Sequence, residues 1–297
     1  MDWSDIALYC GNYIPYLFNS IIYVILLVFF FNSLYFIVSL LVIVLVFVYC
    51  LGGPVEDFNI ELAGIPLNVK CKYKENMAFF DGYYTTKDPV FTVEPDEKDI
   101  KSVQEDFDFL NKTEGNPIIG YSDSFLENNA IHILAAEKLL EYNVLMLHGS
   151  ALAIDSNGII FTAKSGTGKS THTRLWREVF GSRVLMVNDD KPLIRVDEAK
   201  VYGTPWDGKH HLSCNISVPL KAIVKIERSP GNKVTPVNVK EALTVLMKRT
   251  HVPSEQSKRV SIMDLYIKLI KKVPFYRLEC NMDPEAAQVA YKALIKT

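Results

Sequence analysis

The strongest constraint on the fold of this chain is a glycine-rich loop, Ala163-Lys164-Ser165-Gly166-Thr167-Gly168-Lys169-Ser170. Its spacing is that of a Walker A phosphate-binding loop, with alanine in place of the first glycine. Residues 158–162 before the loop predict a buried strand, and residues 171–180 after it predict a helix that ends at Gly181. A strand, a glycine-rich turn and a helix N-terminus in this order surround a phosphate with backbone N–H groups. The sequence therefore predicts a nucleotide-binding site.

Two side chains of this loop have predicted roles of their own. Lys169 supplies a point charge for the β- and γ-phosphates, and the hydroxyl of Ser170 can bind Mg²⁺. A glycine-rich turn without a ligand is the alternative, which the flanking strand and helix disfavour. The predicted nucleotide-binding residues are Ser165, Gly166, Thr167, Gly168, Lys169, Ser170 and Thr171.

Two adjacent carboxylates follow the next predicted strand. Residues 184–187 predict a short buried strand, which ends at Asn188-Asp189-Asp190. A carboxylate in this position can hold Mg²⁺ or accept the proton of an incoming hydroxyl. Neighbouring side chains of a strand point to opposite faces, so both acids can take part only if the chain turns there, and Lys191-Pro192 predicts such a turn. A solvated turn without a chemical role is the alternative.

Three further groups lie near the predicted site. His148 belongs to residues 144–154, a predicted strand antiparallel to the one that feeds the loop, and it is either a structural histidine or one that acts at the phosphate. In the loop of residues 203–211, either Asp207 and the neighbouring lysine reach the phosphates or the metal, or they have no such role. Arg249 is either a second cation at the transferring phosphate or a charge that stabilises the end of a helix.

The N-terminal part of the chain carries no charged residue from Ile6 to Val55. Two apolar stretches of about the minimum spanning length, residues 14–31 and 34–51, flank Asn32-Ser33 and predict a transmembrane helical hairpin. No basic residue precedes the apolar run, which disfavours a signal peptide, and a buried core hairpin is the alternative. With no Lys or Arg near the spans, orientation follows from function. A nucleotide-using domain faces the cytoplasm, so the expected location is the cytoplasmic membrane.

Composition excludes several other classes of protein. The formal net charge of −2 gives no indication of nucleic-acid binding. The five cysteines lie far apart, which argues against a zinc site or a disulfide framework. The predicted class is mixed α/β, with a transmembrane hairpin in residues 1–55, a small α+β subdomain in residues 56–142 and a P-loop kinase core in residues 143–297. An oligomer is compatible with the sequence.

The order strand, His-Gly, turn, strand, Walker A loop, helix, strand and Asp-Asp resembles the catalytic domain of the HPr kinase/phosphorylase family. It resembles most the HPr-kinase-like proteins of bacteria, some of which modify peptides. The residues that match the family's motif positions are His148, Lys169, Ser170, Asp189 and Asp190. The resemblance implies a core of the phosphoenolpyruvate carboxykinase type and transfer of phosphate from ATP to a serine hydroxyl. It also implies that Asp189 is the base, with Lys169 and Mg²⁺ on the phosphates. Asp190 then serves Mg²⁺ with Ser170, and His148 either orients the base or balances its charge.

The resemblance covers residues 147–226, about a quarter of the chain. Ala163 replaces a glycine, residues 203–211 stand where the family has a second glycine- and arginine-rich signature, and residues 1–146 do not look like the family's N-terminal domain. Carboxykinase activity is disfavoured because that family is much longer and its metal and oxaloacetate residues have no counterparts. The predicted function is a Mg·ATP-dependent kinase that acts on a serine of a protein or peptide. A small-molecule kinase on the same core and an ATP-binding membrane adaptor without phosphotransfer remain the alternatives.

Overall fold

The structure is a computed structural model of the 297-residue chain. It describes residues 40–43 and residues 55–297, with the exception of residues 165, 209, 254 and 297. Residues Glu56–Thr297 form one compact unit, and every element named below belongs to it.

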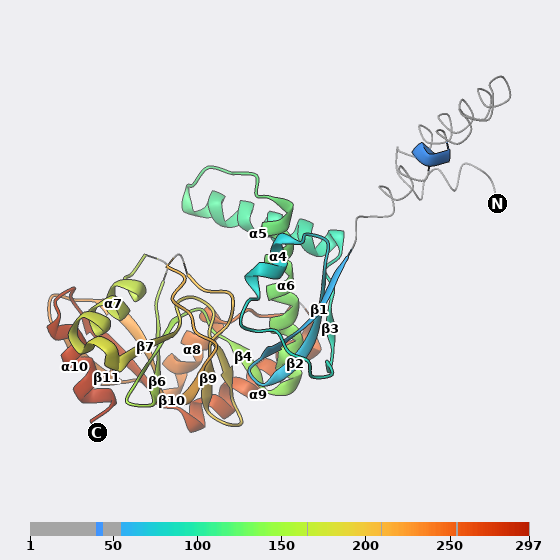
Figure 1. The fold of residues 1–297 in the computed structure, drawn as a ribbon. Helices are drawn as coiled ribbons and strands as arrows, with labels where there is room; N and C mark the ends of the chain where they lie inside the picture. Colours follow the sequence, from blue (N-terminus) through green and yellow to red (C-terminus); the bar gives the residue numbers. More distant parts are fainter. Residues whose placement is uncertain (1–39, 44–54, 165, 209, 254, 297) are drawn as a thin grey trace, which may run out of the picture. The chain divides into compact units, whose positions relative to one another are not determined.

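A mixed sheet lies at the centre of this unit, and the described residues give it nine strands. Its order is β4-β8-β9-β10-β6-β5-β7, with β12 paired to β10 and β11 paired to β12 (Figure 1). Strand β10 is parallel to β6 and to β12, whereas β5 is antiparallel to both of its neighbours. The strands are β4 (Val144–Met146), β5 (Ser150–Ile154), β6 (Asn157–Thr162), β7 (Val184–Asn188), β8 (Leu193–Arg195), β9 (Lys200–Tyr202), β10 (Ser217–Arg228), β11 (Lys233–Pro236) and β12 (Phe275–Cys280).

Helices cover both faces of this sheet because its inner strands are apolar on both sides. In β6, Ile159 and Phe161 pack in one core cluster with residues of α7 and α10. Ile160, between them, packs in the opposite cluster with residues of α8 and α9. This alternation is the period of two that places successive strand side chains on opposite faces. The covering helices are α7 (Lys169–Phe180), α8 (Val239–Arg249), α9 (Gln256–Lys272) and α10 (Glu285–Leu294).

The parallel strands bring their C-terminal ends to one edge of the sheet. Thr162 at the end of β6 lies opposite Lys225, and Arg228 at the end of β10 lies opposite Cys280 at the end of β12. The glycine-rich loop leaves β6 at this edge and α7 begins there. In open α/β sheets, ligands bind outside the carboxyl ends of the strands, so this edge is where a site is expected.

Residues 56–142 add a second, smaller sheet and a helical pair. The sheet has the order β1-β2-β3, and its buried face packs with α6 in a cluster that includes Ile60, Leu67 and Ile131. Helix α5 begins at a capping box built by Asp96 and ends at Gly115. The elements are β1 (Glu56–Leu62), β2 (Ile65–Cys71), α4 (Glu75–Phe79), β3 (Thr92–Val93), α5 (Glu97–Glu114) and α6 (Asp123–Leu139), followed by a 3₁₀ turn (Leu140–Tyr142); a second one (Gly181–Arg183) precedes β7.

The predicted transmembrane hairpin requires correction. Among the described residues, no helix is both long and apolar enough to cross a bilayer. The described part of the second predicted span is a helical stretch at residues 40–43. Residues 14–31 and the rest of residues 34–51 lie outside the described part. The described residues form a mixed α/β fold without the predicted transmembrane element. The membrane location, which was deduced from that element, is therefore not supported.

The predicted strand of residues 144–154 is two strands. Strand β4 pairs with β8, whereas β5 pairs with β6 and β7, and the chain crosses between these partners at His148-Gly149. A Cβ atom at Gly149 would lie 2.8 Å from Cγ2 of Ile160 and 2.9 Å from the carbonyl oxygen of Phe161. The crossing therefore needs a residue without a side chain directly after the histidine.

We expect Gly149→Ala to lower the free energy of unfolding by about 1–3 kcal/mol, because the added methyl group overpacks a backbone that cannot retreat. Urea titration of the full chain measures this. Gly120→Ala is the control, since nothing lies within 4 Å of a Cβ atom there, and it should stay within about 0.5 kcal/mol of the wild type. Equal midpoints for the two variants would contradict the close approach at Gly149.

Candidate active site

The glycine-rich loop turns directly into the N-terminus of α7, as predicted. Gly166 and Gly168 have φ values of 71° and 121°, which suit glycine. Lys169 is the first helical residue and is half-buried; burial lowers its pKa, and the attraction of Asp190 opposes this more strongly than that of Asp189. Ser165 lies outside the described residues. The other predicted nucleotide-binding residues, from Gly166 to Thr171, lie together at the sheet edge.

Arg228, which was not predicted from the sequence, holds this loop. From the end of β10, its Nε donates to the carbonyl oxygen of Thr167 at 3.1 Å, and its Nη2 donates to that of Gly166. The guanidinium therefore fixes the glycine turn to the C-terminal edge of the sheet. Cavities of about 760 Å³ and about 550 Å³ flank the loop, and Gly166, Thr167 and Arg228 line both.

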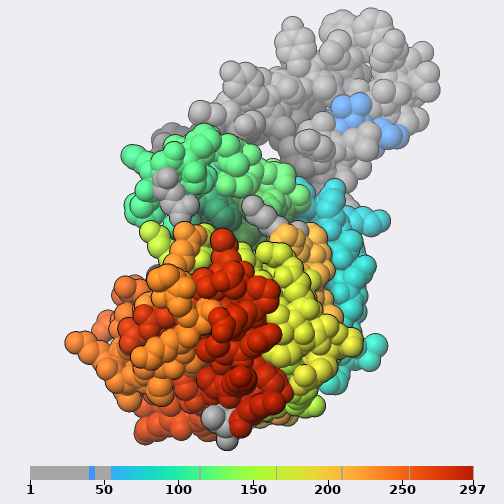
Figure 2. Space-filling model, turned by 90° about the vertical axis from the view of Figure 1, so that its left-hand side faces the viewer, coloured from blue at the N-terminus to red at the C-terminus, as the bar shows by residue number. Residues whose placement is uncertain are grey.

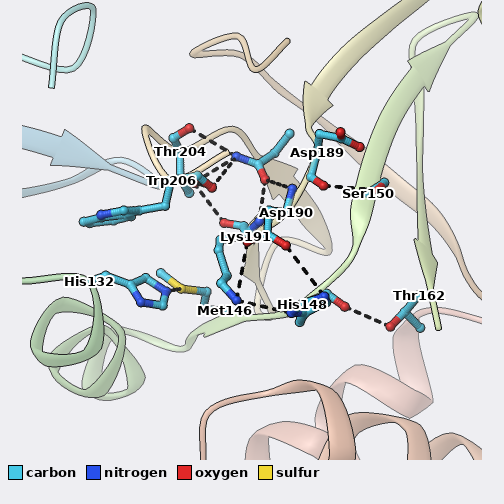
Figure 3. A network of polar contacts seen from close by, with 11 residues as sticks. His132, Met146, His148, Ser150, Thr162, Asp189, Asp190, Lys191, Thr204 and Trp206 are labelled. Atoms are coloured by element: carbon cyan, nitrogen blue, oxygen red, sulfur yellow. Dashed lines mark hydrogen bonds and ion pairs between the residues drawn. The ribbon is translucent and has the colours of Figure 1, made fainter. Parts of the chain in front are cut away.

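The side chain of Asn188 holds the acidic turn in place. It is fully buried at the end of β7. Its Nδ2 donates to the carbonyl and hydroxyl oxygens of Thr204 and to the carbonyl oxygen of Trp206. Its Oδ1 accepts from the backbone N–H groups of Asp190 and Lys191 at 2.8 and 2.6 Å. One amide thus joins the turn after β7 to the loop that starts at Gly203. Figure 3 shows Thr204 and Trp206 of that loop beside Asp190 and Lys191 of the turn.

Asp190, His148 and Lys191 form a cluster of charged and polar groups (Figure 3). Nζ of Lys191 lies 3.2 Å from Nδ1 of His148, and Asp190 lies 3.6 Å from Nε2 of His148 and 3.5 Å from Nζ of Lys191. A lysine ammonium has only donors, so Nδ1 accepts and Nε2 carries the proton that faces Asp190. Burial and the nearby Lys191 lower the pKa of His148 to about 4, which keeps the imidazole neutral at physiological pH.

The backbone of His148 connects three parts of the site. Its carbonyl oxygen accepts from the hydroxyl of Thr162, the last residue of β6, at 2.8 Å. Its N–H donates to the carbonyl oxygen of Arg249, the last residue of α8, at 2.7 Å. The histidine is therefore placed relative to both the strand that feeds the phosphate loop and the end of α8.

Asp189 lines a cavity that the two partners of Asp190, His148 and Lys191, do not line. This cavity of about 470 Å³ is lined by Ser170, Asp189 and His210, together with Arg174 and Arg177. Asp189 is only 5% exposed, and its Oδ1 has no hydrogen-bond partner among the described residues. A buried, unpaired carboxylate oxygen beside a hydroxyl fits Mg²⁺, which takes one or two protein oxygens and completes its shell with phosphate and water. No three His, Cys, Asp or Glu side chains gather as a metal site in the described part of the chain.

A further cavity, of about 350 Å³, lies beside His148 and Lys191, the two residues that contact Asp190. Its lining includes His148 and Lys191, the end of α8, and apolar residues of α5 and α6. We call it the α5–α8 cavity, and it is lined by Val103, Asp106, Phe107, Leu110, Asn129, His132, Ile133, Met146, His148, Lys191, Lys248, Arg249, Thr250 and His251. Figure 2 shows the surface hollowed below the green segment that contains α5 and α6. Lys248 and Arg249 also line the cavity of about 760 Å³ beside the phosphate loop, so they lie between the two spaces.

The loop of residues 203–211 supports the acidic turn through its backbone and its tryptophan. Trp206 is buried, and its Nε1 donates to Asn128 at 3.0 Å. Asp207 is held within its own loop, where it accepts from the N–H of Ser213 and pairs with His211. Lys209 lies outside the described residues. The carboxylate of Asp207 therefore makes its contacts within its own loop and not with the phosphate loop.

His172 is a buried histidine on α7 that the sequence analysis did not single out. It is 2% exposed, and its Nε2 accepts from Nε1 of Trp176 at 2.9 Å. Burial lowers its pKa to about 4. The imidazole therefore packs as a neutral group beneath the start of the helix that carries Lys169.

Comparison with known proteins gives one family and one structural likeness. Residues 125–289, more than half of the chain, match the sequence profile of a family described as SynChlorMet cassette protein ScmC. No curated protein matches the chain. Solved structures that match include the Hpr(Ser) kinase/phosphatase from Coxiella burnetii, with 10% identity, a TM-score of 0.26, and coverage of 51% of this chain and 97% of that one. A similarity this low does not establish a shared fold, so the core of the phosphoenolpyruvate carboxykinase type stays a prediction.

We expect acid to destabilise the fold through His172. Its pKa is about 4 in the folded chain, against an ordinary value of 6.5. Between these values the unfolded chain binds a proton that the folded chain does not, so stability falls as the pH drops from 6.5 toward 4. At pH 5 the loss from this residue is about 2 kcal/mol.

Urea titrations of the full chain at pH 7 and pH 5 measure this loss. His172→Gln keeps an acceptor for Trp176 and removes the titration, so its stability should fall less between the two pH values. His210→Gln, at an exposed position, should behave as the wild type does. The same pH dependence in the wild type and in His172→Gln would contradict this role.

Proposed function

The chain belongs to the SynChlorMet cassette protein ScmC family, and for this member we propose an ATP-dependent phosphotransferase that acts on a hydroxyl group. The observation that carries the proposal is the position of Asp190. Its carboxylate lies beside His148 and Lys191, which line the α5–α8 cavity. Its negative charge also opposes the lowering of the pKa of Lys169 in the phosphate loop. A group that can accept a proton thus stands between a phosphate-binding loop and a second cavity.

On the nucleotide side, the backbone amides at the start of α7 and the ammonium of Lys169 bind the phosphates of ATP. This is supported by the loop geometry and by the helix N-terminus, which favours negative charge. Ser170 and Asp189 would hold Mg²⁺, since they line one cavity and Asp189 has an unpaired oxygen. Mg²⁺ would supply positive charge to the β- and γ-phosphates.

On the acceptor side, we propose Asp190 as the base, which reverses the roles predicted from the sequence for the two acids. The acceptor oxygen forms a bond to the γ-phosphorus, and the bond from that phosphorus to the β–γ bridging oxygen breaks. ADP leaves with the electron pair, and the hydroxyl proton moves to a carboxylate oxygen of Asp190. The neutral His148 orients this carboxylate through its Nε2–H, and Lys191 balances its charge.

Arg249 is the second cation at the transferring phosphoryl group. It lines both the α5–α8 cavity and the cavity of about 760 Å³ beside the phosphate loop, and its side chain has no hydrogen bond or ion pair within the part of the chain that the structure describes. An arginine fork suits the oxygens of a phosphoryl group in transfer. A serine of a protein or peptide is the acceptor we propose, supported by the order of the sequence motifs.

We expect Asp190→Asn to lower turnover about 10²- to 10⁴-fold, the usual contribution of a general base, while leaving ATP affinity unchanged. Asp189→Asn should weaken ATP binding in the presence of Mg²⁺ much more than in its absence. The full chain, incubated with Mg·ATP and a peptide and protein extract of the source cell, is assayed by mass spectrometry for phosphoserine, and calorimetry gives ATP affinity.

Asp264→Asn is the matched control, because Asp264 is an exposed carboxylate on α9, and Lys169→Ala is the inactive reference. Equal losses of ATP binding and turnover in Asp190→Asn would contradict its role as the base. If the wild type binds ATP and yields no phosphorylated product from any acceptor, the proposed transferase activity is wrong.

A further inference from the structure

The α5–α8 cavity combines an apolar wall with cations, and this combination describes the acceptor more closely than the proposed function does. Phe107 and Leu110 of α5 and Ile133 of α6 form part of the wall. Leu110 is 52% exposed although it is a large apolar residue. Binding of a ligand that covers apolar surface beside a recess is favourable, because the ligand removes that surface from water. The wall therefore fits an apolar group of the acceptor.

The cations of this cavity differ in how far they are already neutralised. Lys191 is held by Asp190 and His148, and His251 pairs with Glu137 at 3.0 Å. The side chains of Lys248 and Arg249 have no hydrogen bond or ion pair with any residue that the structure describes. Two cations at the end of α8 are thus available to ligands.

The phosphate loop has other cations near it, so Lys248 and Arg249 are not both needed to bind the nucleotide. Lys164 and Arg228 line the neighbouring cavity beside the loop, and Lys169 begins α7. With Arg249 placed at the transferring phosphoryl group, Lys248 is left as the free cation on the acceptor side. The one acid in the lining of this cavity is Asp106, which is exposed and has no ion pair among the described residues.

We propose that the α5–α8 cavity selects an acceptor whose hydroxyl is flanked by a bulky apolar group and by a carboxylate. The apolar group packs on Phe107, Leu110 and Ile133, and the carboxylate pairs with Lys248. This rests on the proposed function, because it places the acceptor hydroxyl at Asp190. Such chemistry occurs in an acidic peptide and in a small hydroxy acid, and a volume of about 350 Å³ suits a side-chain-sized group of either.

The test measures phosphorylation of defined probes by the full chain with Mg·ATP. The parent peptide probe is acetyl-Leu-Ser-Glu-amide. Its relatives carry Ala in place of Leu, or Gln or Lys in place of Glu, and each peptide is also tested with the residues before and after the serine exchanged. The small-molecule probes are 3-hydroxyoctanoate, 3-hydroxyoctanamide and 3-hydroxybutanoate. In either series, the probe with both the apolar group and the carboxylate should have the lowest KM. Its KM should be about tenfold lower than that of the probe with the smaller apolar group, and about three- to tenfold lower than that of the probe with an amide in place of the carboxylate. Whichever series is phosphorylated identifies the source of the acceptor.

Two variants assign the preferences to residues, each with a matched control. Lys248→Glu should reverse the charge preference, so that the Lys-containing peptide becomes the better acceptor. Lys240→Glu, on the exposed first turn of the same helix, should leave it unchanged. Leu110→Gln should remove the preference for Leu over Ala, whereas Phe109→Gln, at a residue 69% exposed that is not part of the lining, should not.

Binding without transfer separates this proposal from the proposed function. Calorimetry measures the binding of acetyl-Leu-Ala-Glu-amide, which has no hydroxyl, and of octanoate to the full chain with Mg·ADP. Selective binding with no phosphorylated probe would support the cavity and overturn the transferase activity. Phosphorylation with no charge or size preference, or a preference that Lys248→Glu does not change, would overturn the cavity proposal alone. Neither binding nor phosphorylation would overturn both.

Discussion

The candidate site depends on one buried amide, that of Asn188. An amide has two N–H donors and an oxygen with two lone pairs. Here the donors face Thr204 and Trp206, and the oxygen accepts from two successive backbone N–H groups. A buried polar group that loses its partners costs about 1–3 kcal/mol, so this arrangement is strongly preferred over others. It forces the chain to turn directly after β7, and at that turn Asp189 lines one cavity whereas Asp190 contacts His148 and Lys191, which line another.

A second constraint is the crossing of the chain at His148-Gly149. Strand β5 must approach β6 closely, and only glycine permits this. The same crossing ties the backbone of His148 to the end of β6 and to the end of α8. The residue that orients Asp190, the strand that feeds the phosphate loop and the helix end with Arg249 therefore share one set of short contacts.

The parts of this site that the sequence predicts are those set by neighbours in the chain. The loop, its flanking strand and helix, and the polar residues after β7 follow from local spacing, and the structure brings Lys169, Ser170, Asp189, Asp190 and His148 to one edge of the sheet. What each acid faces was not predictable, because it depends on Thr204 and Trp206, which follow Asn188 in the chain by 16 and 18 residues. Lys191 was interpreted only as part of a turn, since its contact with His148 joins residues 43 positions apart. The membrane hairpin was predicted from the length and hydropathy of two apolar stretches, and no helix among the described residues is long and apolar enough to cross a bilayer.

The neutral state of His148 makes physical sense in this surrounding. Lys169, Lys191 and Arg249 all lower its pKa, and Asp190 alone among the named charges raises it. An imidazolium would add a further cation that competes with Lys191 for Asp190. A neutral imidazole instead offers one N–H, which can fix the orientation of the carboxylate without neutralising it. Burial and the cations around the histidine thus keep it neutral, and its Nε2–H faces Asp190.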